Sequence, residues 1–182
     1  PQGTARTWGA VANENGHAAP TVVAMGADLY KPGQLPALVS GFDWVIIDSP
    51  PRAAEIQRAA LMVADLAILP CGPSAFDAWA LAESVELVKA AQRVRPQLKA
   101  VVLLTRKATG TVIGKGARDV LVEVGLPVLR AELGFRVVYQ EAPAAGLGPA
   151  QYAPSSEAAE EVRALTDEVL SLASVTKPKR KR

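Results

Sequence analysis

Cysteine and histidine are almost absent from this chain: each occurs once among 182 residues, as Cys71 and His17. A single cysteine cannot form an internal disulfide, and one cysteine with one histidine cannot supply the ligand set of a zinc or iron–sulfur centre. His17 lies in the polar stretch NENGHAAP without a serine or cysteine nucleophile motif, so we expect a loop residue there. These scarcities exclude zinc sites, iron–sulfur sites and disulfide-stapled folds.

Long apolar runs are also missing, because none approaches the roughly 18 residues that a membrane-spanning helix needs. The first residues show no basic segment followed by an apolar one, as a secretory signal would. Apolar residues make up 49% and charged residues 21%, which is typical of a globular protein rather than a disordered one. We therefore expect a cytoplasmic protein that makes no membrane contact.

The net charge of +2 depends on the end of the chain, and without that end the sequence is net acidic. We expect residues 175–182 to be a basic disordered tail, which either anchors the protein electrostatically or only solubilises it. Its five cations are Lys177, Lys179, Arg180, Lys181 and Arg182.

Short apolar runs alternate with helix-like segments, which is the pattern of parallel βαβ units. Most runs are continuously apolar, as in strands that are covered on both faces. We predict one α/β domain over residues 1–174, with a mostly parallel, doubly wound sheet flanked by helices. The predicted strands are Thr21–Ala24, Trp44–Ile47, Leu66–Leu69, Ala100–Leu104 and Val128–Ala131.

Helical periodicity and end signals predict four helices between and after these strands. One covers Ala53–Ala64, and one opens at a Ser74/Asp77 capping box. A third covers Ala117–Val124, and the last begins near Ser155 or Ser156. The helix after the capping box is expected to bury Trp79, Ala82, Val85 and Val88, and the last helix Val162, Leu165, Val169 and Leu172.

Asp48 ends the apolar run WVII, and ligands of open α/β sheets bind beyond the carboxyl ends of strands. An acid in that position either holds a magnesium ion near a nucleotide phosphate or caps the following turn, and the pattern alone does not choose. A nucleotide site needs a phosphate cradle of the form G-x-x-x-x-G-K-[ST]. The nearest stretch, GTVIGKG at 110–116, has its glycines one residue too close and Gly116 in the place of Ser or Thr, so it is interpreted as a flexible basic loop.

Several motifs in a fixed order nevertheless resemble the ParA-type partition ATPases, the deviant-Walker P-loop group that also includes MinD. The resemblance implies a P-loop NTPase fold. The matching stretches are PQGTARTW at 1–8, GFDWVIIDSPPR at 41–52, ADLAILPCGPSAFDAWALAESVEL at 64–87, LLTRKATGTVIGKGARDVL at 103–121 and GFRVVYQEAPAAGLGPAQYAPSSEAAEEVRALTDEVL at 134–170.

The resemblance also implies ATP and Mg²⁺ as cofactors and assigns roles to particular residues. Asp48 would be the catalytic-site residue that holds Mg²⁺ through water. Nucleotide contacts would come from Gln2, Gly3, Thr105, Arg106, Gly134 and Phe135, with the last four beside the adenine base. Non-specific DNA contacts would come from Lys107, Lys115, Arg118, Arg130 and Arg136, although each of these is equally consistent with a solvated surface charge.

Family members segregate plasmid or chromosomal DNA as homodimers and act with a centromere-binding, ParB-like partner, which implies a nucleoid-associated protein. A membrane role is not expected, since the last helix is acidic and no apolar residue follows Val175. The family's first strand, phosphate loop and second strand, roughly 35 residues, would precede Pro1. We therefore expect this chain alone not to hydrolyse ATP. A non-catalytic DNA- or partner-binding relative is the alternative, and ATP binding distinguishes the two.

Overall fold

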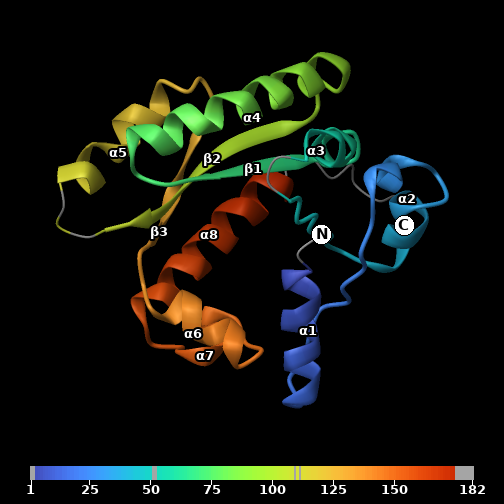
Figure 1. Cartoon of the computed structure of the whole chain (residues 1–182), viewed down its shortest axis with the longest axis horizontal. Helices are drawn as coiled ribbons and strands as arrows, with labels where there is room; N and C mark the ends of the chain where they lie inside the picture. Colours follow the sequence, from blue (N-terminus) through green and yellow to red (C-terminus); the bar gives the residue numbers. More distant parts are fainter. Residues whose placement is uncertain (1–2, 51–52, 109, 111, 175–182) are drawn as a thin grey trace.

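The computed structural model describes residues 3–50, 53–108, 110 and 112–174, and it is an α/β structure with a parallel sheet (Figure 1). Strands β1 (Leu66–Cys71), β2 (Lys99–Lys107) and β3 (Val128–Gly134) lie in the order β1-β2-β3. The predicted parallel sheet flanked by helices is confirmed. The helices are α1 (Thr4–Glu14), α2 (Leu35–Leu38), α3 (Ala54–Leu61), α4 (Ala75–Val94), α5 (Val112–Val122), α6 (Val138–Ala144), α7 (Pro149–Tyr152) and α8 (Glu157–Ser174), with 3-10 turns η1 (Ala27–Tyr30) and η2 (Val39–Gly41).

Helices cover both faces of the sheet: α4 and α5 lie on one side and α8 on the other (Figure 1). The larger core cluster joins α4 and α5 to alternate residues of the central strand, Ala100, Val102 and Leu104. Val101 and Leu103 point to the opposite face, where the second cluster includes Leu165 and Leu172 of α8. Because β2 is buried on both faces, its continuously apolar sequence is explained.

Helix α4 begins where the sequence predicts, but it buries a different face. The Ser74 side chain accepts a hydrogen bond from the Asp77 N–H, and the Asp77 carboxylate accepts one from the Ser74 N–H, which completes the capping box. The buried positions are Ala78, Leu81, Val85 and Val88. Trp79 and Ala82 are exposed, so the predicted inward placement of these two is wrong. Apolar residues surround most of α4, so its periodicity did not distinguish adjacent faces.

Helix α5 begins earlier than expected. Gly110 is in a turn with φ 77°, and α5 begins at Val112. The stretch 112–116 is therefore helical rather than the loop that was predicted. The end of the helix agrees with its signals, since α5 finishes at Val122 and Gly125 follows in the left-handed conformation.

Two predicted strands are not formed in the described part of the chain. Thr21–Ala24 and Trp44–Ile47 have no regular secondary structure, and Ile46 is 93% exposed. A β-strand needs hydrogen bonds from a neighbouring strand, and the three strands of the described sheet pair only with one another. Apolar sequence alone therefore did not produce a strand at either run.

Candidate functional site

The carboxyl ends of the three strands meet at one edge of the sheet, because all three strands are parallel. The Thr105 hydroxyl donates a hydrogen bond of 3.1 Å to the Cys71 carbonyl, which links the ends of β2 and β1. The Phe135 N–H donates one of 3.0 Å to the Lys107 carbonyl, which links β3 to β2. Four residues that the family resemblance assigns to the nucleotide base are therefore brought to a common edge: Thr105, Arg106, Gly134 and Phe135.

Arg106 has a strained backbone at this edge. Its φ of 55° lies in the left-handed region, and among the described residues no other non-glycine has a positive φ. Its guanidinium turns back over Gly72 and lies 3.0 Å from an Asp77 carboxylate oxygen. A Cβ on Gly72 would lie 2.5 Å from Asp77 Oδ2 and 2.8 Å from Arg106 Nη2, so a larger residue at position 72 would displace these two side chains. Strain that neighbours hold in place is common at binding sites.

Asp77 therefore connects the start of α4 to the strained Arg106. Its carboxylate accepts a hydrogen bond of 2.5 Å from the Ser74 hydroxyl and contacts Arg106 with its other oxygen. The Ser74 hydrogen bond, helped by the nearby Arg106, lowers the pKa of Asp77 below its usual value, although partial burial opposes this. Asp77 is thus a stable anion beside the edge.

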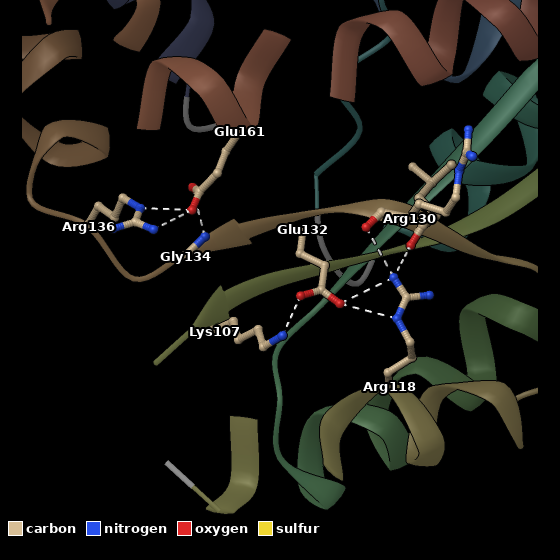
Figure 2. Close-up of polar contacts among 8 residues, drawn as sticks. Lys107, Arg118, Arg130, Glu132, Gly134, Arg136 and Glu161 are labelled. Atoms are coloured by element: carbon tan, nitrogen blue, oxygen red, sulfur yellow. Dashed lines mark hydrogen bonds and ion pairs between the residues drawn. The ribbon is translucent and has the colours of Figure 1, made fainter. Parts of the chain in front are cut away.

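The loop after β3 forms the other side of the edge and is tied to α8 by Glu161. Gly134 N–H donates to Glu161 Oε2 at 3.0 Å, and Arg136 Nε donates to Oε1 at 2.8 Å, as Figure 2 shows. Phe135, between them, is 66% exposed. The backbone of this loop is therefore held while an aromatic side chain remains on the surface.

Two of the cations that the family resemblance assigns to DNA, Lys107 and Arg118, pair with one carboxylate within the protein (Figure 2). Glu132 on β3 lies 2.5 Å from Lys107 Nζ and 3.2 Å from Arg118. Arg118 also donates to the Leu129 carbonyl at 2.6 Å, so it joins α5 to β3. Lys107 and Arg118 thus have structural roles that the sequence did not reveal.

The remaining cations differ in exposure. Arg130 is 91% exposed in its side chain, and its Nε lies 3.7 Å from Glu168. Arg136 contacts both Glu157 and Glu161, and its pKa is raised, chiefly by the hydrogen bond to Glu161. Lys115 lies in α5, but its side chain is outside the described residues. Arg130 is the most exposed of the four predicted DNA contacts whose side chains are described.

The residues that the resemblance places on the magnesium and phosphate side, Asp48 and Gly3, belong to segments other than the three strands of the described sheet. Asp48 is exposed in an irregular segment, so the expectation that it ends a buried strand is wrong. Gly3 caps the start of α1 with φ 67°, and Gln2 lies outside the described residues. Within the described ranges, no three or more His, Cys, Asp or Glu residues form a group that could hold a metal ion. Within the described residues, Asp48 thus offers a single carboxylate, which is the kind of ligand that a water-mediated magnesium contact would use.

Comparison with known proteins gives a similarity to a curated protein. No family model matches the chain. The chain is 28% identical over 130 residues to the maintenance of carboxysome distribution protein A of Halothiobacillus neapolitanus, a match that covers 70% of this chain and 60% of that protein. In the described ranges, no helix is both long and apolar enough to cross a membrane. The similarity supports the ParA-like relationship that the sequence motifs indicate.

Proposed function

We propose that the protein is a ParA-type ATPase that positions or partitions a cargo, with the adenine base of ATP at the carboxyl edge of β2 and β3. One observation carries this proposal. Thr105 and the strained Arg106 lie at the end of β2, and Gly134 and Phe135 lie beside them at the end of β3. The similarity to a protein named for carboxysome distribution supports a positioning role. Dimer formation and a partner protein belong to this proposal as well.

The chain's own residues would orient the base rather than carry out the phosphate chemistry. The Thr105 hydroxyl and the Lys107 carbonyl are already used between strands, so they keep the strand ends in register. The Arg106 guanidinium is largely exposed but fixed by Asp77, and its planar face is suited to stack on a base. Asp48 would hold the water shell of Mg²⁺. ATP with Mg²⁺, when bound, supplies the hydrolysable phosphate that drives such switches.

Nucleotide binding tests the proposal directly. We expect Arg106→Ala to weaken binding of fluorescently labelled ATP by about tenfold, because an arginine contact to the ligand is lost. Arg93→Ala is the matched control, since Arg93 is exposed near the opposite end of α4 and lies far along the helix from the capping box. The measurement is an equilibrium titration with Mg²⁺ present.

Two results would contradict parts of the proposal. If the wild-type protein does not bind ATP, the ATPase assignment fails, and DNA binding that persists without ATP favours the non-catalytic alternative. If Arg106→Ala and Arg93→Ala bind ATP as the wild type does, the base does not lie at this edge.

Non-specific DNA binding, which the proposal includes, predicts an unusual gain of affinity. Glu132→Gln would remove the carboxylate that neutralises Lys107 and Arg118, so both cations become available to phosphate groups. We expect DNA affinity to rise about threefold to tenfold at low salt, and the slope of log affinity against log salt to steepen by about two, since each released cation contributes about 0.9. Fluorescence anisotropy with labelled duplex DNA over a salt series measures both quantities.

Glu86→Gln serves as the control for net charge, because Glu86 is exposed on α4 and pairs only with Lys89 in the contacts described. Glu86→Gln removes one negative charge, as Glu132→Gln does, but it releases no predicted DNA contact. Equal affinities and slopes for the two variants would mean that Lys107 and Arg118 do not contact DNA.

A further inference from the structure

Two glutamates on α8 reach the backbone of the edge strand β3 in similar ways. Glu161 Oε2 accepts a hydrogen bond of 3.0 Å from the Gly134 N–H. Glu168 accepts bonds of 3.0 Å from the Arg130 N–H and 2.8 Å from the Ala131 N–H. The two residues are seven positions apart and so share one face of the helix. Their side chains are almost equally exposed, at 18% and 17%.

The two carboxylates differ in where they act. Glu168 binds the first half of β3, at a distance along the strand from the candidate base site. Glu161 binds its last residue, Gly134, where the strand passes into the exposed loop that holds Phe135. Of these two carboxylates, Glu161 is therefore the one that is placed to control the shape of that loop, where Glu157 also pairs with Arg136.

Glu161 also holds the loop beyond the strand. Arg136 donates to Oε1 through both Nε, at 2.8 Å, and Nη2, at 2.7 Å. The Tyr139 hydroxyl, at the start of α6, donates to Oε2 at 2.8 Å. One carboxylate thus connects the strand end, the loop and the following helix, and its two oxygens each accept two hydrogen bonds.

The protonation states agree with this arrangement. Burial alone would raise the pKa of Glu161, but bonds from Arg136, Gly134 and Tyr139 hold it below its usual value. Burial, and then the bond to Glu161, raise the pKa of Tyr139, so its hydroxyl remains a donor. Gly134 is also enclosed, because an added Cβ would lie 3.0 Å from both Arg136 Nε and Glu161 Oε1. The loop therefore has little freedom to move while these contacts persist.

We propose that Glu161 is a positioning residue that fixes the loop at 134–137 in the shape that receives the nucleotide base. This inference rests on the proposed function, since the base site itself is part of that proposal. Glu161 touches neither base nor phosphate in this role. It acts through Gly134 and Arg136, and it leaves Phe135 free on the surface to contact the ligand.

The first test measures the loop itself and needs no nucleotide. Glu161→Gln keeps the size of the side chain but removes its charge, and Glu168→Gln is the matched variant two turns along α8. In hydrogen–deuterium exchange we expect Glu161→Gln to speed exchange about tenfold in peptides covering 134–139. Glu168→Gln should speed exchange at 130–131 instead. Unchanged exchange at 134–139 in Glu161→Gln would overturn the inference.

The second test measures base recognition, with ATP, GTP and inorganic tripolyphosphate as probes. We expect Glu161→Gln to weaken ATP binding about threefold to tenfold and to bring the affinities for ATP and GTP closer together. Tripolyphosphate binding should not change, and Glu168→Gln should keep the wild-type ratio of ATP to GTP affinity. If both variants lost the same amount of ATP affinity, Glu161 would only stabilise the fold, and the inference would be contradicted. A wild-type protein that binds none of the nucleotides would instead overturn the proposed function, and with it the base-positioning role.

Discussion

Replacing Gly146 with alanine should destabilise the protein by roughly 2–5 kcal/mol and release α1 from the body of the structure. Gly146 follows α6 with φ 74°, a conformation that costs an L-residue free energy. An added Cβ would also lie 2.5 Å from both the Cα and the N of Ala12. These atoms belong to the α1 backbone and cannot turn away as a side chain would. The effects of strain and overlap therefore add at one position.

The affected contact is the main attachment of α1 in the described structure. Ala12 is fully buried against the 145–147 turn. On either side of it, Trp8 Nε1 donates to the Leu147 carbonyl at 3.3 Å and Asn15 donates to the Ala145 carbonyl at 3.1 Å. Gly3, which the family resemblance places near the phosphates, caps the same helix. Loss of this docking should therefore weaken nucleotide binding as well as stability.

Gly16 provides a control that isolates the overlap. Its φ of 72° almost equals that of Gly146, but nothing lies within 4 Å of an added Cβ. Gly16→Ala should cost only the backbone strain, about 1–2 kcal/mol. Urea denaturation of the two variants measures the difference, with Trp44 and Trp79 replaced by Phe in both so that the fluorescence of Trp8 reports α1 docking. Equal midpoints for the two variants would mean that α1 does not pack on Gly146 as described.

The paired strands could be predicted from sequence because their burial on two faces leaves a continuous apolar run. Leu66–Leu69, Ala100–Leu104 and Val128–Ala131 all lie within strands of the sheet. The equally apolar Trp44–Ile47 does not form a strand, since strand formation also depends on a neighbour elsewhere in the chain. Local pattern thus identifies a segment that can pair, but not whether its partner is beside it.

The candidate site was predictable to a similar degree. The family resemblance placed Thr105 and Gly134 on the two sides of one base, and the structure brings both to one edge because parallel strands end together. The carboxylates that fix the edge were not found, since Glu161 lies 27 residues from Gly134 and Glu132 lies 25 from Lys107. Such pairs leave no local spacing signal. The one clue to these contacts was that Glu161 and Glu168 are seven residues apart on α8 and so share a face. That spacing is equally typical of a helix face exposed to solvent.

Leu104→Ala should cost about 2–5 kcal/mol, which places it beside Gly146→Ala among the largest expected effects. Leu104 is completely buried in the larger core cluster, between α4 and the sheet. Its neighbours across the sheet are Cys71 and Glu132, so a cavity there would be enclosed by strands on both sides. The surrounding backbone is held by the ladder and cannot close the space, which is why the cost should be near the upper part of that range.

Leu104→Ala should also alter ATP binding at the candidate site, because Leu104 immediately precedes Thr105 and Arg106. Ile68→Ala on the adjacent strand is the matched control, since Ile68 is 37% exposed and its loss should cost below about 1.5 kcal/mol. Equilibrium urea unfolding should show a lower midpoint with an unchanged slope for Leu104→Ala. A similar small cost for both variants would contradict the tight packing beneath the edge. Another outcome is that Leu104→Ala is strongly destabilised but, while still folded, binds ATP as the wild type does. In that case Gly72 and Asp77 alone hold the strained Arg106. The core beneath it then contributes stability without shaping the site.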